Sequence, residues 1–433
     1  MTAIKYKNIY IIGMGVSGIS AAKALSELGH NIYIYDDNKK FSDISENLSN
    51  CEFIHYDNIK WDALDYLVLS PGIPTKLPKA HPAIKYAVKH KVKITIDIEL
   101  FLNLVPKANI IAITGTNGKS TTTALINHIF KHNGYDAFMG GNIGEAVFKL
   151  PIKNNKKTYY ILELSSFQLE LIDKARFNAA ILLNLSEDHL DRHGNMSNYL
   201  EAKLKIFANQ KENDLSLINK DLSDNKLIKS LANQISFFSA NNLDIPSDIN
   251  IAKFGSNENL ISAIEVAKFY NITHLIINEA LKTYKSLPHR LEYLGEINNA
   301  VIYNDSKATN AESTKNALVK FSNICLILGG VAKSSGIKSL KNHLKNVSSI
   351  FLIGEAKNEF AKELDQFNYQ NYHKASSLDE AFKKALNFAK NSSEKVTILL
   401  SPACASFDMW QNFVERGNNF KKLFKEHKDG ETL

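Results

Sequence analysis

The chain has 433 residues, of which 44% are hydrophobic and 22% charged, and its formal net charge is +7 at pH 7. This composition excludes a largely disordered chain, and the length suits about three domains of roughly 150 residues. The 52 basic and 45 acidic residues form no long run of like charge, which argues against a nucleic-acid-binding protein but suits small anionic substrates.

The first hundred residues alternate short apolar runs with helical patterns, which predicts βαβ units and a parallel sheet. A helix is expected from about Ser17. The expected strands are NIYIIG (8–13), NIYIYDD (31–37), YLVLSPG (66–72) and VKITID (92–97).

The stretch GMGVSG (13–18) follows the first strand, opens the helix and is trailed by Asp36 at the end of the next strand. This is the pattern of a dinucleotide-binding turn, so a dehydrogenase that binds a nicotinamide cofactor is one alternative. The apolar N-terminus also imitates a secretory signal, but its glycines and Lys23 interrupt the apolar run.

A domain boundary is expected near Asp97, before the strand NIIAITG (109–115). The loop GTNGKS (115–120) and the helix TTTALINHIF (121–130) follow it directly. Glycine N–H groups and a helix start can wrap a phosphate, Lys119 adds a positive charge, and Ser120 offers a hydroxyl to magnesium. The sequence therefore predicts a nucleoside triphosphate site, although Ile113 stands where the standard loop has glycine. The alternative is a plain glycine-rich turn.

Carboxylates follow two further strands, TYYILELS (158–165) and AAILLNLS (179–186). Glu163 should lie at the same sheet edge as the loop, where it could bind magnesium. The second strand ends in EDHLDRHG (187–194), in which Glu187, His189 and His193 have the spacing of a zinc site. We favour magnesium beside the phosphates over zinc.

The last part begins after the helical pattern ENLISAIEVAKFYN (258–271), with a second boundary near Leu287. Four buried strands are predicted there, AVIYND (300–305), ICLILGG (324–330), SSIFLIG (348–354) and KVTILLSP (395–402). The chain should thus hold three α/β domains in series, at 1–97, 98–287 and 288–433.

Nine motifs together resemble, in this order, the bacterial peptidoglycan Mur ligases. They are TGTNGKST (114–121), GGNIG (140–144), LELSSFQLE (162–170), NLSEDHLDRHG (184–194), EAKLKIF (201–207), LPHRLE (287–292), NDSKATN (304–310), LGG (328–330) and LSPACASFDMWQNFVERG (400–417). The resemblance implies a Rossmann-like first domain, a central P-loop ATPase-like domain and a Rossmann-like third domain. It also implies a cytoplasmic enzyme that uses ATP and two Mg²⁺ ions to add D-glutamate to UDP-N-acetylmuramoyl-L-alanine through an acyl-phosphate. We expect the chain to be a monomer.

The resemblance assigns roles to residues by matching position. Those implied to bind the UDP substrate are Gly15, Val16, Ser17, Asp36, Asp37, Ser70, Pro71, Gly72 and Asn142. Those implied to bind ATP are Gly115, Thr116, Asn117, Gly118, Lys119, Ser120, Thr121, Asn259, Arg290, Asp305 and Lys307. Those implied to bind D-glutamate are Thr309, Lys333, Ser406 and Phe413. The implied catalytic residues are Lys119, Glu163, His189 and Lys203, and the implied metal ligands are Ser120, Glu163, His189 and a carbamylated Lys203.

Without the resemblance, Lys203 would be read as an ordinary exposed helix lysine. Three positions depart from the family pattern. Asn38 stands where an arginine is often found, Val331 where an aspartate is often found, and ENLIS (258–262) replaces the usual HNxxN.

Two other classes remain as alternatives to a peptidoglycan ligase, a folylpolyglutamate synthase and an NTP-gated regulatory module. The GMGVSG segment before the phosphate loop argues against the former.

Cys51, Cys325 and Cys404 lie far apart and are odd in number, which fits a reducing cytoplasm. No segment offers about 20 uninterrupted apolar residues for a membrane span.

Overall fold

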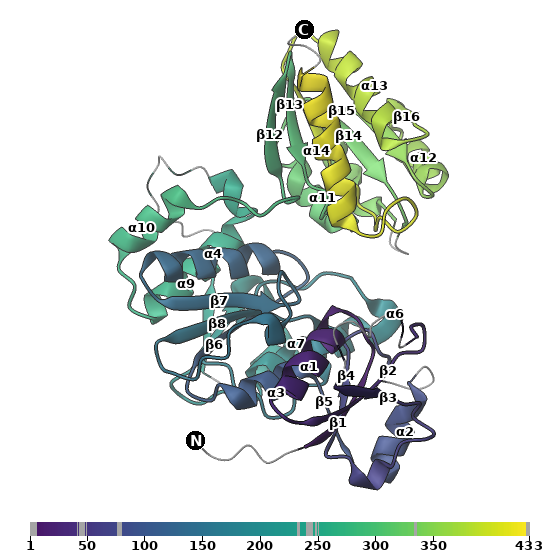
Figure 1. Cartoon of the computed structure of the whole chain (residues 1–433). Helices are drawn as coiled ribbons and strands as arrows, with labels where there is room; N and C mark the ends of the chain where they lie inside the picture. Colours follow the sequence, from purple (N-terminus) through teal and green to yellow (C-terminus); the bar gives the residue numbers. More distant parts are fainter. Residues whose placement is uncertain are drawn as a thin grey trace. The chain divides into compact units, whose positions relative to one another are not determined.

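A computed structural model of the chain describes residues 7–40, 42, 48, 50–75, 80–231, 234–239, 246, 249, 251–332 and 336–429. The strands form three sheets in series along the chain, with helices beside them (Figure 1). The α/β fold class predicted from the sequence is confirmed.

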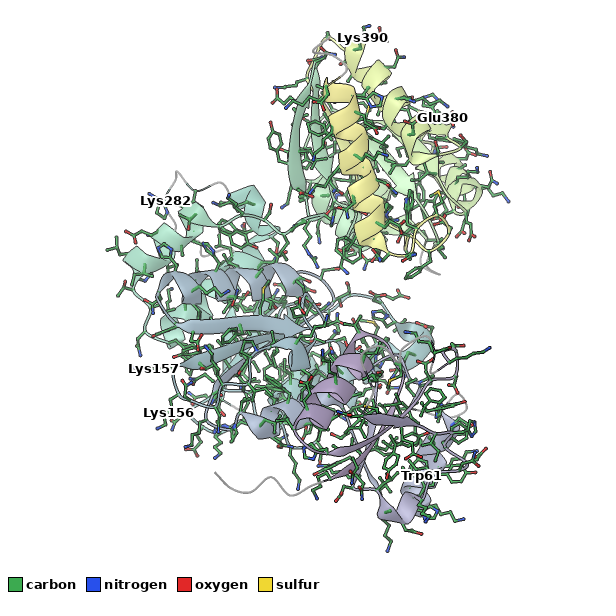
Figure 2. All side chains as sticks on the ribbon, in the orientation of Figure 1. Trp61, Lys156, Lys157, Lys282, Glu380 and Lys390 are labelled. Atoms are coloured by element: carbon green, nitrogen blue, oxygen red, sulfur yellow. The ribbon has the colours of Figure 1, made fainter. Side chains whose placement is uncertain are left out.

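Sheet A lies in the first segment and is entirely parallel. In spatial order its strands are β3 (Cys51–Phe53), β2 (Asn31–Tyr35), β1 (Asn8–Ile12), β4 (Tyr66–Leu69) and β5 (Lys93–Thr95). Strands β1, β2, β4 and β5 are those predicted, and β3 is an addition. Trp61, labelled in Figure 2, stacks on Tyr86 with ring centroids 5.6 Å apart, which extends the core beside this sheet.

Sheet B lies in the middle segment and is also parallel. Its strands are, in spatial order, β11 (Ile235–Phe238), β10 (Leu215–Asn219), β9 (Ala179–Leu182), β6 (Asn109–Thr114), β8 (Thr158–Glu163) and β7 (Asp136–Gly141). The predicted strands β6, β8 and β9 are neighbours. Their carboxyl ends therefore meet at one edge, which is where an open α/β sheet binds its ligands.

Sheet C lies in the last segment and mixes strand directions. Its strands are, in spatial order, β12 (Glu292–Ile297), β13 (Ala300–Asn304), β17 (Val396–Leu400), β14 (Ile324–Gly329), β15 (Val347–Ile353) and β16 (Tyr372–Lys374). The four predicted strands are present. β12 is antiparallel to β13 and forms an edge, in a stretch where no strand is predicted from the sequence.

Helices connect the strands and cover the sheets. The α-helices are α1 (Val16–Glu27), α2 (Pro82–Lys89), α3 (Asp97–Leu104), α4 (Lys119–His132), α5 (Ser166–Glu170), α6 (Leu190–His193), α7 (Met196–Leu204), α8 (Lys226–Lys229), α9 (Asn257–Phe269), α10 (His274–Thr283), α11 (Ala311–Leu318), α12 (Lys357–Gln366), α13 (Leu378–Lys390) and α14 (Phe413–Asp429). Short 3₁₀ helices are η3 (Trp61–Ala63), η4 (Val147–Lys149), η5 (Lys205–Phe207), η6 (Lys220–Leu222), η7 (Ile251–Phe254) and η8 (Lys338–Asn346). In the middle segment, α4 packs on β6, β7 and β8, and α9 packs beside α4 (Figure 1).

The chain divides into two compact units. One comprises Met1–Ile249 and Asn257–Tyr284, and the other Asn250–Ser256 and Lys285–Leu433. Sheets A and B both belong to the first unit and sheet C to the second. The domain boundaries near residues 97 and 287 stay predictions.

All three cysteines are free and buried, Cys51 in β3, Cys325 in β14 and Cys404 after β17. Burial raises the pKa of all three thiols, to about 12 for Cys325 and Cys404. Among the described residues, no helix is both long and apolar enough to cross a membrane.

The Glu99 carboxylate joins α3 to the chain after α5. It is 3% exposed and accepts backbone N–H groups from Asp173 (3.2 Å), Lys174 (2.8 Å) and Ala175 (3.2 Å). Glu99→Ala leaves these donors without their acceptor, so we expect the free energy of unfolding to fall by about 3 kcal/mol. Glu99→Gln keeps the shape and one acceptor oxygen, and should cost about half as much in urea unfolding at pH 7.5. Equal stability of the alanine variant and the unmodified chain would contradict this reading.

Asp97, at the start of α3, is a buried acid whose stability effect depends on pH. Its side chain is 4% exposed, its Oδ1 has no hydrogen-bond partner among the described residues, and burial raises its pKa to about 6. The pKa in the unfolded chain is about 3.9, so the folded state holds the proton more tightly, and stability is lost as pH rises from about 4 through 6. We expect Asp97→Asn to raise the free energy of unfolding by up to about 3 kcal/mol at pH 8 and by little at pH 4. Urea unfolding at both pH values measures this, and a pH-independent difference would refute it.

Candidate active site

The loop 115–118 connects β6 to α4 at the carboxyl edge of sheet B. Asn184, which follows β9, holds it through Oδ1, which accepts the N–H groups of Thr116 (3.1 Å) and Asn117 (2.9 Å). Gly118 has a φ of +83° and faces the Asn259 side chain, so a Cβ there would collide with it. The sequence predicted the loop and Asn259 but not Asn184, although its place at a strand end was a usable signal.

Two lysine ammonium groups converge on one backbone carbonyl of this loop. Lys119 Nζ donates to Gly115 O at 2.9 Å and to Thr116 O at 2.8 Å, and Lys203 Nζ donates to Gly115 O at 2.8 Å. Lys119 begins α4, with Ser120 and Thr121 next in its first turn. Positive charge and a helix N-terminus therefore lie together, as an anion site requires.

Glu163 lies opposite the loop. The strand register pairs it with Ile113 of β6 and Gly141 of β7. Its Oε2 accepts a hydrogen bond from Ser120 Oγ at 2.5 Å, and its Oε1 accepts one from Asn142 Nδ2 at 3.0 Å. Three residues predicted from the sequence are thus in direct contact.

Ser120 and Glu163 suit magnesium, because their hydroxyl and carboxylate oxygens are the donors that this ion prefers. No cluster of three or more His, Cys, Asp or Glu side chains that could hold a metal lies within the described part of the chain. A metal site here would therefore draw on the Ser120 hydroxyl and on other oxygen donors. The Lys203 amine can join it only after modification.

Lys203 lies in α7 and is buried, with 1% of its surface exposed. Its ammonium lies 4.4 Å from the centre of the Tyr199 ring, and the Tyr199 hydroxyl lies 3.4 Å from Thr116 Oγ1. Burial, and second the neighbouring Lys119 charge, hold the pKa of Lys203 well below its ordinary value. A lysine with this environment is held at the site and is not the exposed helix lysine that its sequence context suggests.

The two histidines of the EDHLDRHG segment have different surroundings. His189 occupies the N-cap position of α6, with a φ of 55°, and its ring centroid lies 4.9 Å from that of Phe167. The His193 side chain is fully buried, and its Nε2 lies 2.9 Å from Ser166 Oγ. Within the described part of the chain, these histidines and Glu187 do not form a cluster that could hold a metal ion, so the zinc alternative is not supported.

The motif SSFQLE folds locally as a capped helix. The Ser165 hydroxyl accepts the Gln168 N–H at 3.3 Å, and Gln168 Oε1 accepts the Ser165 N–H at 2.9 Å. This capping box starts α5 two residues after Glu163 and fixes the direction of the chain there.

The first glycine turn is tied to its neighbouring strands. Asp36 Oδ2 accepts the Met14 N–H at 2.6 Å, and Ser70 Oγ donates to Gly13 O at 2.6 Å. Lys39 Nζ donates to Met14 O at 2.6 Å, which brings a cation to the turn from the residue after Asn38. Residues predicted to bind the UDP substrate thus gather at the carboxyl edge of sheet A.

The remaining predicted members of that group lie beside the turn. Gly15, Val16 and Ser17 form the start of α1, where Val16 is 64% exposed. Asp37 Oδ2 lies 3.1 Å from His81 Nε2. Pro71 and Gly72 follow Ser70 after β4, whereas Asn142 lies at the edge of sheet B beside Glu163.

In the second unit, Asp305 follows β13 at the carboxyl edge of sheet C. It is 8% exposed, and its oxygens accept hydrogen bonds from Ser401 Oγ (2.8 Å) and the Leu291 N–H (3.1 Å). Burial raises its pKa to about 7, against the pull of these bonds and of Arg290. Lys307 lies with its ammonium 4.0 Å from the centre of the Phe413 ring.

The other predicted amino-acid-binding residues belong to the same unit. Thr309 donates its N–H to Lys307 O at 2.8 Å, and Phe413 begins α14. Ser406 is 2% exposed. Lys333 lies outside the described residues.

Arg416 lies in the motif at 400–417, but no role was predicted for it. It is fully buried in α14, where Nε donates to Ser306 Oγ (3.0 Å) and Nη2 to Ser306 O (2.8 Å) and Cys404 O (3.0 Å). It therefore holds the segment with Asp305 and Lys307 against the segment that leads to Ser406.

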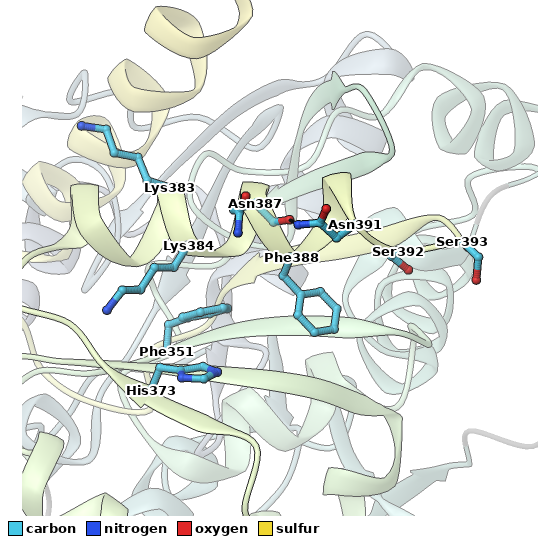
Figure 3. A pocket seen from close by; sticks show the side chains of 9 residues that line it. All are labelled: Phe351, His373, Lys383, Lys384, Asn387, Phe388, Asn391, Ser392 and Ser393. Carbon is cyan, nitrogen blue, oxygen red and sulfur yellow. Dashed lines mark hydrogen bonds between the residues drawn. The ribbon is translucent and has the colours of Figure 1, made fainter.

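The second unit also has a cavity of about 820 Å³ between α13 and strands β15 and β16 (Figure 3). Phe351, His373 and Phe388 line it with Lys383 and Lys384 at its side. Both lysines form i, i+4 ion pairs along α13, so their charge is locally balanced. No predicted site residue lines this cavity, and it is separate from the candidate site.

Three family models match the chain in series. They are described as the Mur ligase MurD-like N-terminal domain (residues 7–96), the Mur ligase middle domain (113–283) and the Mur ligase glutamate ligase domain (289–404).

Full-length relatives are similar to the chain as well. A UDP-N-acetylmuramoylalanine--D-glutamate ligase of Wolbachia sp. subsp. Brugia malayi (strain TRS) is 35% identical over an alignment of 500 positions, which covers 100% of this chain and 99% of the relative. A ligase of the same name from Rickettsia bellii (strain RML369-C) is 36% identical, with 98% of each chain covered. Among solved structures, the MurF ligase of Thermotoga maritima in complex with ADP has a TM-score of 0.60 and 16% identity, with 93% of this chain and 96% of that chain covered. At that identity the likeness concerns the fold alone.

Proposed function

The chain belongs to the Mur ligase family, and from that premise we propose that it is the ATP-dependent ligase that joins D-glutamate to UDP-N-acetylmuramoyl-L-alanine. The observation that carries the chemistry is the contact of Ser120 with Glu163 directly beside the Lys119 loop. The full-length similarity to ligases of that name supports the choice of substrates.

Each sheet carries the residues proposed for one substrate. Residues 1–97 hold the UDP precursor at the turn that Asp36 and Ser70 tie together. Residues 98–287 hold ATP at the segment 115–121, and residues 288–433 hold D-glutamate near Thr309, Lys333, Ser406 and Phe413. The grouping of these residues, Lys333 apart, at or next to the carboxyl edges of sheets A, B and C supports this division.

In the proposed reaction, the precursor carboxylate attacks the γ-phosphorus of ATP, which forms an acyl-phosphate and releases ADP. The amino group of D-glutamate then attacks the acyl carbon, loses a proton and expels phosphate as the amide bond forms. Lys119 turns from its loop carbonyls to the β- and γ-phosphates, and the loop N–H groups hold the phosphate oxygens. Mg²⁺, held by Ser120 and Glu163, with His189 and a carbamylated Lys203 as further ligands, would neutralise phosphate charge.

A phosphate-release assay tests the proposal. Phosphate should appear only when ATP, UDP-N-acetylmuramoyl-L-alanine and D-glutamate are all present, and other amino acids should give little. ATP hydrolysis without any amino acid would instead indicate a nucleotide-gated module.

Isotope labelling tests the intermediate separately. Oxygen-18 in the carboxylate of the precursor should appear in the released phosphate, because the carboxylate oxygen becomes the bridging atom of the acyl-phosphate. Phosphate without label would rule this route out.

A cytoplasmic location and a monomeric state stay predictions. Light scattering would test whether the chain is a monomer.

A further inference from the structure

One guanidinium group joins the carboxyl edges of sheets A and B. Arg192 lies in α6, after β9 of sheet B, and its side chain is 15% exposed. Its Nη1 donates to Pro71 O at 3.2 Å and its Nη2 to Ile73 O at 3.3 Å. Both carbonyls belong to the loop after β4 of sheet A, which contains Ser70, Pro71 and Gly72.

The other contacts of Arg192 fix it to the middle segment. Its Cζ lies 4.3 Å from the centre of the Phe167 ring, and its Nη2 lies 3.5 Å from Glu170 Oε2. A planar guanidinium can stack on a ring, pair with a carboxylate and donate two further hydrogen bonds at once, whereas a lysine ammonium cannot. An arginine is therefore suited to hold these three contacts at once, and a lysine is not.

Glu170 is itself held in place on the sheet B side. Its side chain is 7% exposed, and its Oε1 lies 3.5 Å from Nδ1 of the buried His193, whose Nε2 contacts Ser166 Oγ. Ser166 starts α5, three residues after Glu163. The anchor of Arg192 is thus continuous with the chain that carries Glu163, while its hydrogen bonds reach the loop of sheet A.

We propose that Arg192 is a positioning residue that fixes the position of the UDP-binding loop 70–72 relative to the phosphate loop. This inference rests on the proposed function. The named hydrogen-bond acceptors of Arg192 are protein carbonyls and its charge faces Glu170, so its role is to place other groups and not to bind phosphate. Near-attack geometry tolerates little error, since a misplacement of about 1 Å can cost about 100-fold in rate.

Steady-state kinetics of the full chain test this role. We expect Arg192→Ala to lower kcat/KM for UDP-N-acetylmuramoyl-L-alanine about 100-fold, while the Kd of ATP, measured by calorimetry with a non-hydrolysable analogue, changes less than about twofold. Arg192→Lys should keep only part of the activity. Millimolar guanidinium should restore turnover of the alanine variant, because it can occupy the vacated place.

Arg176 provides a matched control. It pairs with Asp214 through two contacts of 2.7 Å, lies in the same unit and has a 39% exposed side chain. Arg176→Ala should leave the kinetics close to those of the unmodified chain.

Two results would overturn the inference. One is normal kcat and KM for Arg192→Ala in a preparation whose unmodified chain is active. The other is loss of ATP binding together with UDP-substrate turnover and no rescue by guanidinium, which would mark Arg192 as a fold-stabilising residue only. If the unmodified chain did not ligate D-glutamate, that result would instead contradict the proposed function, and the inference would fail with it.

Discussion

Lys119→Ala is expected to lower kcat/KM for ligation on the order of 1,000-fold. The variant lacks the charge that the proposed reaction sets against the β- and γ-phosphates, and phosphoryl transfer depends on such charge and positioning more than on covalent help from the protein. Phosphate release under saturating D-glutamate measures the effect.

The same substitution should leave the fold intact. Lys119 is only half-buried, its hydrogen bonds go to carbonyls of its own loop, and no apolar core volume is lost. The thermal midpoint should stay within about 3 °C of that of the unmodified chain. Lys131, exposed in the last turn of the same helix, is the control, and Lys131→Ala should be fully active. Normal turnover of Lys119→Ala would remove the phosphate-loop assignment.

Glu163→Gln is expected to lower kcat about 100-fold and to raise the Mg²⁺ concentration that gives half the maximal rate. The change removes one negative charge but keeps the shape of the side chain, and an amide oxygen can still accept the hydrogen bond from Ser120. Initial rates over a series of Mg²⁺ concentrations measure both effects.

Glu145 offers the comparison for this variant. It is an exposed carboxylate close to the same sheet edge, and its only ion pair in the described structure is a 3.7 Å contact with Lys149. Glu145→Gln should therefore leave the rate and its Mg²⁺ dependence unchanged. An unchanged Mg²⁺ dependence in Glu163→Gln would refute the role of Glu163 at a metal site.

The sequence predicts the central strands of the fold because they are short, mostly apolar runs that are rich in isoleucine. The run NIIAIT forms β6 and ICLILG forms β14, both in sheet centres. The strands that escaped prediction include β3 and β16, of three residues each at sheet edges, and β12, whose exposed and buried positions alternate irregularly. Edge strands need less apolar sequence, so their signal is weaker.

The candidate site was also predicted only in part. That residues 115–121 and Glu163 lie together could be predicted, because parallel strands end at a common edge. The burial of Lys203 and the contacts of Arg192 and Glu99 could not be predicted, since their partners lie 74 to 121 residues away in sequence. Such contacts depend on how separate segments pack, which hydrophobic periodicity does not encode.

The three buried thiols give the native chain intrinsic reporters of local opening. Their high pKa values and their burial protect them from alkylating reagents, so each can be labelled only while its surroundings are transiently exposed. Cys51 reports on the first sheet, and Cys325 and Cys404 on the last. Because no cysteine lies in the middle segment, labelling rates followed by mass spectrometry would separate the motions at the two ends of the chain without any engineered probe.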